Sequence, residues 1–347
     1  MSNFDKYYEL RKVDAHMHYN TNRPALLEIA KDYNFRYISF NTDIYFFPSV
    51  TDQEKIVLHQ RETFGNRLDY LCTFSGNGFD QKDWAKKATE SIARSMVNGS
   101  VGVKIWKNLG MELKDKSGKL VMVDDPRLSP IFEFLVKNKI PLTGHLGEPK
   151  NCWLPLENMT VDQDRKYFAE HPEYHMYLHP EFPSYEQQIE ARDNVLRKYP
   201  GLIFCGAHFA SLEWSVDEIA KRLDAFPHMM VDTAERICHI QHQSVTDYEK
   251  ARKFVLKYHD RIMYSTDVID DGKLSCEELK QHITSIWDRH WKYFTTDVMQ
   301  TAPKVNGAFK GLNLPWEAIE NIYYKNAERF YKLHDIKESA KMSLMKK

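Results

Sequence analysis

The sequence predicts a (β/α)8 TIM barrel, in which eight parallel strands are each followed by a helix. Two observations support this fold class. Strand-like and helix-like stretches alternate almost from end to end, and the strand-like runs number eight. The competing architecture is an open doubly wound sheet. It receives less support because no GxGxxG or GxxxxGK[ST] loop follows a strand.

The predicted elements follow from local composition. The clearest helical patterns cover residues 83–97, 126–137, 212–226 and 247–258. Asp125 followed by Pro126 predicts a helix cap and a first-turn proline. Ser215 and Glu218 have the form of a capping box, which suggests that the third helix begins later than residue 212. The eight β-prone runs are 12–18, 36–41, 70–75, 101–106, 140–146, 202–208, 228–233 and 261–267.

Two segments exceed the regular strand–helix unit. Residues 147–190 form a long aromatic insert after the fifth strand, and residues 268–314 lengthen the last crossover. Inserts at the C-terminal face of a barrel commonly form lids and pockets. Because no repeat or low-complexity linker divides the chain, we expect one domain over residues 1–347. Its core would cover about 12–335 and end in an extended C-terminal helical segment.

Composition excludes several classes of protein. Apolar residues make up 42% and charged residues 28% of the chain, which is typical of a globular protein. The formal charge of −1 gives no reason to expect nucleic acid or an anionic membrane as a partner. The five cysteines are scattered without a CxxC pair, which predicts buried thiols in a reducing compartment. With no apolar leader or membrane-spanning run, we expect a cytoplasmic protein that acts on a small molecule.

Metal-ligand side chains are predicted at the ends of four strands. His16 and His18 share one face of the first strand because side chains alternate along a strand. His145 ends the fifth strand, His208 the sixth and Asp267 the eighth. The C-terminal ends of barrel strands meet at one mouth, so these side chains should converge there. Imidazole and carboxylate groups are ready ligands for zinc and related ions.

Lys104 lies on the face of the fourth strand opposite to Val101, Val103 and Ile105, and we expect this face to point into the barrel mouth. A lysine inside the mouth has two interpretations. Carbamylated by carbon dioxide, it would be an anion able to bridge two metal ions. As an ammonium, it would bind a substrate anion or pair with a carboxylate. The residues themselves leave both open.

The pattern resembles the amidohydrolase superfamily, in particular its amidohydrolase-2 (amidohydrolase-related) branch, which includes decarboxylases. The matching segments are VDAHMH, GVKIW, IPLTGH, IFCGAHFAS, MYSTD and IYYKNAERFYKL, which together span nearly the whole chain. The resemblance implies that His16, His18, His145 and Asp267 ligate one divalent ion, usually zinc, with manganese or a second ion as alternatives. It also implies that His208 binds a second ion or acts on the substrate, that Lys104 matches a position some members carboxylate, and that a homodimer forms.

Three histidines and one aspartate leave an open position where zinc lowers the pKa of a bound water to ~7. Asp267 can accept the water proton, and His208 can stabilise the developing oxyanion. We therefore expect hydrolysis of a C–N or C–O bond in an amide, lactone or ester. The alternatives are a metal-dependent decarboxylase, a metal-independent lactonase and a non-catalytic binding barrel. A glycosidase needs two carboxylates ~5–9.5 Å apart, for which only Asp267, Asp232 and Glu148 are candidates.

Substrate-binding residues are expected in the loops after the strands. Arg236 suits a bidentate clamp for a carboxylate. The aromatic residues of the insert, Tyr167, Phe168, Tyr174, Tyr177 and Phe182, are expected to form its own small core, and His171, His175 and His179 to be surface histidines. The other candidates are Trp106, Lys107 and Asn108 after strand four and Glu148 and Trp153 after strand five.

Overall fold

All eight predicted strands are present in the computed structural model, which describes residues 3–333. Neighbouring strands pair in parallel, in the order β8-β7-β6-β5-β4-β3-β2-β1-β9. The first eight are β1 (Lys12–Tyr19), β2 (Phe35–Phe40), β3 (Leu68–Cys72), β4 (Gly102–Ile105), β5 (Leu142–Gly144), β6 (Phe204–Gly206), β7 (Met229–Asp232) and β8 (Ile262–Met263).

The last strand segment joins the first. The short strand β9 (Ile269–Asp270) pairs with β1, and the Ala15 N–H donates to the Tyr264 carbonyl over 3.0 Å. The Asp267 N–H donates to the His16 carbonyl over 2.9 Å. Because β8 and β9 belong to one chain segment, these bonds close the ring of strands into a barrel. The predicted α/β barrel is therefore confirmed.

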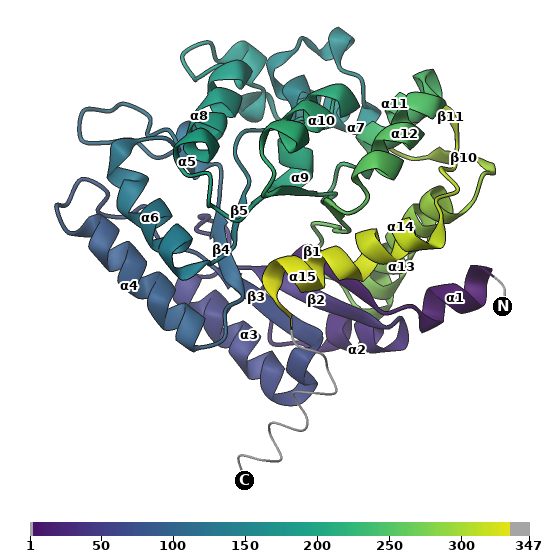
Figure 1. Cartoon of the computed structure of the whole chain (residues 1–347), viewed down its shortest axis with the longest axis horizontal. Coiled ribbons are helices and arrows are strands. Elements are labelled where there is room, and N and C mark those ends of the chain that lie inside the picture. The colour runs from purple at the N-terminus through teal and green to yellow at the C-terminus, as the bar shows by residue number, and fades with distance from the viewer. Residues whose placement is uncertain (1–2, 334–347) are drawn as a thin grey trace.

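Helices surround the strands (Figure 1). The four helices predicted most clearly correspond to α4 (Trp84–Val97), α6 (Ser129–Asn138), α10 (Val216–Ala225) and α12 (Tyr248–Tyr258). Helix α10 begins after Ser215, whose hydroxyl accepts the Glu218 N–H. Among the described residues, no helix is both long and apolar enough to cross a membrane. The longer helices are α2 (Ala25–Asp32), α3 (Val50–Phe64), α4 (Trp84–Val97), α6 (Ser129–Asn138), α7 (Asp162–Glu170), α8 (Tyr185–Lys198), α10 (Val216–Ala225), α11 (Ile237–Thr246), α12 (Tyr248–Tyr258) and α13 (Cys276–Thr295).

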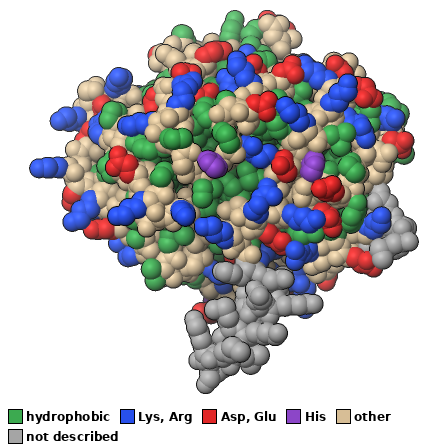
Figure 2. Space-filling view, viewed as in Figure 1, with side chains coloured by type: hydrophobic (Ala, Val, Ile, Leu, Met, Phe, Trp, Pro, Cys, Tyr) green, Lys and Arg blue, Asp and Glu red, His purple; other side chains and the backbone are tan. Residues whose placement is uncertain are grey.

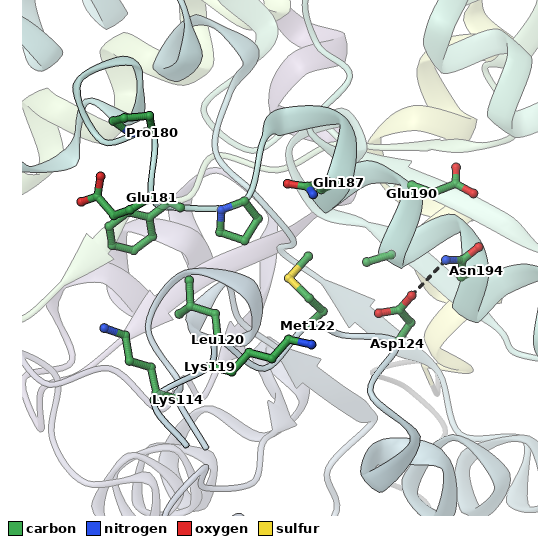
Figure 3. A pocket seen from close by; sticks show the side chains of 14 residues that line it. Lys114, Lys119, Leu120, Met122, Asp124, Pro180, Glu181, Gln187, Glu190 and Asn194 are labelled. Carbon is green, nitrogen blue, oxygen red and sulfur yellow. Dashed lines mark hydrogen bonds between the residues drawn. The ribbon is translucent and has the colours of Figure 1, made fainter. Parts of the chain in front are cut away.

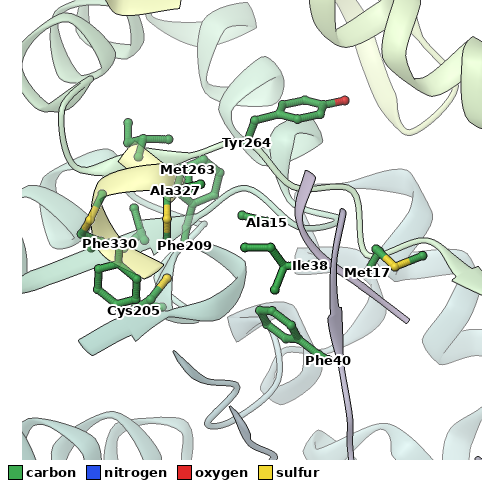
Figure 4. Packing of buried hydrophobic residues seen from close by; sticks show 14 of the residues in the cluster. Ala15, Met17, Ile38, Phe40, Cys205, Phe209, Met263, Tyr264, Ala327 and Phe330 are labelled. Carbon is green, nitrogen blue, oxygen red and sulfur yellow. The ribbon is translucent and has the colours of Figure 1, made fainter. Parts of the chain in front are cut away.

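The C-terminal segment closes one side of the barrel core. It comprises α14 (Trp316–Glu320), a π-helical turn and α15 (Asn326–Tyr331). Figure 4 shows Ala327 and Phe330 of α15 beside Cys205 and Met263 from the strands. The Tyr331 hydroxyl lies 2.7 Å from the Thr143 hydroxyl on β5. This segment therefore packs against residues of β5, β6 and β8.

The two long segments contain structure of their own. The second one, residues 268–314, holds α13 and an antiparallel hairpin of β10 (Met299–Ala302) and β11 (Val305–Lys310). The insert has a small core of Cys152, Met159, Phe168 and Met176, with Phe182 packed against it. The prediction was wrong for the three tyrosines of the insert, which are 39–52% exposed: Tyr167, Tyr174 and Tyr177.

Two further expectations need correction. His175 is buried, because its Nε2 lies 2.7 Å from the Leu154 carbonyl and is held inside the insert. Cys276 is exposed because it begins α13, whereas the other four cysteines are buried as expected.

Candidate metal centre and its cavity

Three of the predicted ligands converge at the mouth of the barrel. His16 Nε2 and His18 Nε2 lie 3.2 and 3.4 Å from Asp267 Oδ1. The two histidines come from β1, and Asp267 follows β8, which hydrogen-bonds to β1. These three donor atoms lie within 4.8 Å of one another. The closure of the barrel thus brings residues 16 and 267 together.

The tautomers of His16 and His18 leave the Nε2 atom of each ring as an acceptor on the side of Asp267 Oδ1. His16 Nδ1 lies 2.9 Å from Asp232 Oδ2, and His18 Nδ1 lies 2.8 Å from the Phe40 carbonyl. Neither oxygen can donate, so both rings carry a proton on Nδ1 and, when neutral, an acceptor on Nε2. Burial lowers the pKa of His16 well below its usual value and keeps it neutral.

A cation fits this convergence of acceptors. Within residues 3–333, the buried oxygen Asp267 Oδ1 has no hydrogen-bond donor. Buried polar atoms without a partner are rare, and an ion is one of the ordinary reasons for them. Two imidazole nitrogens and a carboxylate oxygen form a donor set suited to zinc, manganese or another divalent ion. The residues present therefore fit a divalent ion.

His145 and His208 form a second pair beside this group. His208 Nδ1 lies 2.8 Å from the Ala234 carbonyl, so Nδ1 carries the proton and Nε2 is an acceptor. His208 Nε2 lies 3.1 Å from His145 Nδ1, which must then donate. This assignment leaves His145 Nε2 as a free acceptor. Burial lowers the pKa of both rings, to about 3 for His208, and both are neutral at ordinary pH.

The chain takes a left-handed path where it carries His208. Residues 208–211 all have φ between 53° and 60°. Such a conformation costs non-glycine residues roughly 1–2 kcal/mol each, so a run of four needs compensation. Arg192 of α8 donates to the Ala210 carbonyl, and the Tyr185 hydroxyl donates to the Ser211 carbonyl over 2.5 Å. Asp267 also has a positive φ of 64°. Strain of this kind concentrates at functional sites.

Asp232 connects the two groups of histidines and was not predicted in this role. Its Oδ2 accepts the His16 Nδ1 proton, and its Oδ1 accepts the backbone N–H of His208 over 2.8 Å. Oδ1 also accepts the Ala234 N–H over 3.2 Å. A carboxylate behind a ligand histidine fixes its tautomer and orientation. The signal in the sequence was its position at the end of the seventh strand.

Lys104 points into the mouth, as predicted. Its Nζ lies 3.4 Å from His16 Nε2 and 4.8 Å from the centre of the Phe40 ring. The side chain is 1% exposed. Burial lowers the pKa of Lys104 to about 8, although Asp232 and Asp267 act in the opposite direction. Both interpretations of Lys104 remain predictions.

The ligands lie at the base of a cavity of about 360 Å³. Trp106 and Glu148, both predicted, line it, and so does Lys107, which forms an ion pair with Glu148. Burial lowers the pKa of Lys107 to about 8. Much of the remaining wall is aromatic and includes Tyr45, Phe46, Phe47, Tyr167, Tyr174 and Phe182. The cavity therefore combines an aromatic wall, a cation and the metal-ligand group.

Three predicted substrate-binding residues do not line this cavity. Asn108 Oδ1 accepts the Leu109 N–H, and Trp153 Nε1 donates to the Pro183 carbonyl over 3.2 Å, so both side chains are used locally. Arg236 follows β7 but lies near carboxylates. Burial lowers its pKa, yet Asp164 and Glu213 outweigh this and raise it. Lys104 and Lys107, rather than Arg236, thus supply the basic side chains of the cavity wall.

A larger groove of about 1,100 Å³ lies on the other side of Phe182, which lines both spaces. Figure 3 shows its floor and sides, formed by residues 114–124 and by the segment from Pro180 to Asn194. Basic and acidic side chains are interspersed over the face of the molecule seen in Figure 2, in keeping with the near-neutral composition.

The fold and this site define an α/β barrel with a metal-ligand group at the C-terminal ends of its strands. Residues 13–333 match the family model described as Amidohydrolase, and the chain belongs to this family. No curated protein matches the sequence.

Several solved structures share the fold. An uncharacterized TIM-barrel protein from Bordetella bronchiseptica is 14% identical, with a TM-score of 0.53 over 93% of this chain and 99% of that one. A 2,6-dihydroxybenzoate decarboxylase from Rhizobium is 15% identical, with a TM-score of 0.54 over 93% and 99%. A 5-carboxyvanillate decarboxylase from Novosphingobium aromaticivorans is 12% identical, with a TM-score of 0.54 over 94% and 97%.

Proposed function

We propose that this protein is a metal-dependent hydrolase that cleaves a C–N or C–O bond of a small organic substrate. The observation that carries the proposal is the convergence of His16 Nε2, His18 Nε2 and Asp267 Oδ1 at the base of an enclosed cavity. A bound divalent ion would lower the pKa of a coordinated water to ~7 and polarise a substrate carbonyl. We expect one zinc ion, with manganese as the alternative.

The protein's own groups supply the proton transfers. Asp267 Oδ1 accepts a proton from the attacking water and passes it to the leaving group. His145 and His208 are held by each other and by the Ala234 carbonyl, which leaves His145 Nε2 as an acceptor that would ligate the ion rather than donate to a substrate oxygen. The aromatic wall excludes water and stacks on a flat substrate.

Decarboxylation of an aromatic carboxylate is the second candidate, and the cavity wall favours it. Lys107 supplies the anion-binding group that such a reaction needs, and aromatic rings face it across the cavity. Two proteins of the same fold are decarboxylases, and one of them was solved with manganese and 4-hydroxy-3-methoxy-5-nitrobenzoic acid. At 12–15% identity, these neighbours support the fold and suggest a reaction to test.

One assay separates the two reactions. The protein, purified without chelator and then loaded with zinc or manganese, is offered aryl lactones, esters and anilides alongside hydroxybenzoates. Hydrolysis releases a carboxylic acid without carbon dioxide, whereas decarboxylation releases carbon dioxide. Turnover of the first group supports the proposal, and turnover of hydroxybenzoates alone would replace it with the second candidate.

Metal content tests the site independently of the substrate. Elemental analysis of the purified protein should find about one ion per chain, lost in His18→Ala and His145→Ala. His59→Ala is a matched control because His59 is an exposed histidine on α3. Retention of the metal in His18→Ala would show that the ion binds elsewhere. Two ions per chain in the presence of bicarbonate would assign the bridging role to Lys104.

A further inference from the structure

A small pocket of about 60 Å³ lies beside the end of β8, apart from the metal-ligand cavity. Thr266 lines it, whereas the next residue, Asp267, lines the large cavity. The other side chains come from the chain after β7 and from α13 and the hairpin that follows it. Loops after the seventh and eighth strands form phosphate sites in many barrels of this kind.

Gln241 and Arg289 supply donors without an acceptor to this pocket, whereas Lys304 pairs with Glu235 and the Thr266 hydroxyl donates to Asp14. Gln241 on α11 is 3% exposed, and its side-chain amide has no hydrogen-bond partner among the described residues. Arg289 on α13 likewise has no ion-pair or hydrogen-bond partner in residues 3–333. Both side chains are therefore available to a group bound in the pocket.

His290 adds a hydrogen-bond donor to the pocket, and Lys304 adds a positive charge. The Tyr264 hydroxyl lies 3.1 Å from His290 Nδ1, and with Tyr264 donating, the neutral ring presents its Nε2 proton as a further donor. Lys304 also lines the pocket, and its charge, like that of Arg289, lowers the pKa of His290. Glu235 supplies the one carboxylate in the lining, and Lys304 already pairs with it over 2.6 Å.

We propose that this pocket binds a phosphate group, held by Arg289, Gln241 and His290. Arginine, an amide and an imidazole N–H together match the oxygens of a phosphate. The size agrees, because a water needs about 10–15 Å³ of such space and 60 Å³ therefore admits about five heavy atoms. The site is separate from the metal centre and does not depend on the reaction catalysed there.

Calorimetric titration of the metal-loaded protein with inorganic phosphate tests the proposal. We expect saturable binding at submillimolar concentration, weakened at least tenfold in both Arg289→Met and Gln241→Glu. The second variant keeps the shape of the side chain while placing a negative charge against the phosphate. Lys292→Met is the matched control, since Lys292 is an exposed lysine on the same helix, and it should bind normally.

Three results would overturn the proposal. They are no saturable binding to wild type, binding to Arg289→Met and Gln241→Glu as tight as to wild type, and loss of binding only in His16→Ala. The last would place the phosphate on the metal. Circular dichroism and thermal unfolding of each variant separate lost binding from lost fold. Glycerol 3-phosphate in a parallel titration distinguishes the source of the phosphate group: tighter binding than inorganic phosphate identifies a phosphate monoester, and weaker binding the free ion.

Discussion

Asp232 Oδ2 lies 2.9 Å from His16 Nδ1, and both side chains are 1% exposed. The other oxygen of the same carboxylate accepts the backbone N–H groups of His208 and Ala234. One buried residue therefore fixes the tautomer of a ligand on β1 and the strained turn after β6. Burial raises the pKa of Asp232, although the hydrogen bonds from the N–H groups of His208 and Ala234 oppose the increase.

Asp232→Asn should weaken metal binding about 10- to 100-fold, the usual cost of losing a carboxylate behind a ligand histidine. The amide offers one acceptor oxygen where the structure uses two. Either His16 or the backbone of residues 208 and 234 must then face an N–H₂ group. The metal affinity is measured by competition with a chromogenic chelator.

Asp217→Asn is the control, because Asp217 is an exposed aspartate on α10. It removes the same charge without touching the site. Unchanged metal affinity in Asp232→Asn would show that the hydrogen bond to His16 does not orient the ligand.

Gly206→Ala should destabilise the protein by at least about 2 kcal/mol and displace His208. A Cβ at this position would lie 2.3 Å from the Ala210 Cβ and 2.8 Å from the Ala210 Cα, because the left-handed turn folds back over Gly206. Gly201→Ala is the control, since its Cβ would meet only Val136 at 3.4 Å. Denaturant unfolding of both variants measures the difference, and equal stabilities would contradict the tight packing of this turn.

The sequence was sufficient for the barrel and for the convergence of His16, His18 and Asp267. His16 and His18 were predicted because an i, i+2 pair on a strand shares one face, and Asp267 because it ends the last strand. Asp232 was missed because its role depends on the turn that carries His208. That turn, Ala207–Ser211, has no glycine to announce four positive φ angles in a row. Local composition cannot reveal a conformation that distant groups impose.

The residues that line the cavity were predicted less completely. Trp106 and Glu148 line the cavity, but the sequence favoured Arg236 over Lys107 as the anion-binding group. Both residues follow strands and both carry a charge, so position and type alone could not separate them. The difference lies in the tertiary fold, which places Lys107 in the cavity wall and Arg236 outside it, near Asp164 and Glu213.

Lys12 should make stability depend on pH. It is the buried first residue of β1, and its ammonium group donates to the carbonyls of Tyr7 and Leu10. Burial lowers its pKa from 10.5 to about 7. Between about pH 7 and 10.5, the unfolded chain therefore binds more protons than the folded one, and the free energy of unfolding rises with pH.

Lys12→Met should remove this contribution. The free energy of unfolding, measured with urea from pH 6 to pH 10, should increase less steeply in the variant, by up to about 1.4 kcal/mol per pH unit. The slope is the readout, because the variant also loses two hydrogen bonds and its stability shifts uniformly. Parallel curves for the two proteins would show that Lys12 keeps its ordinary pKa in the fold.

Lys107→Met should weaken the binding of an aromatic carboxylate to the cavity about tenfold, the loss expected for one charge-assisted hydrogen bond. Lys107 lines the cavity together with Lys104 and the aromatic rings, and it is already paired with Glu148. Calorimetric titration of the metal-loaded protein with salicylate measures the change. Glu148→Gln should have the opposite effect, because it releases the ammonium from its partner.

The charge of Lys107 can be separated from its bulk in two ways. Salicylamide, which has the ring without the carboxylate, should bind wild type and Lys107→Met equally. Burial lowers the pKa of Lys107 to about 8, so the ammonium is lost above that pH and salicylate binding to wild type should fall there. Lys116→Met, in an exposed loop, is the control. If salicylate binds Lys107→Met as tightly as wild type, the cavity recognises the ring and the metal alone holds the carboxylate.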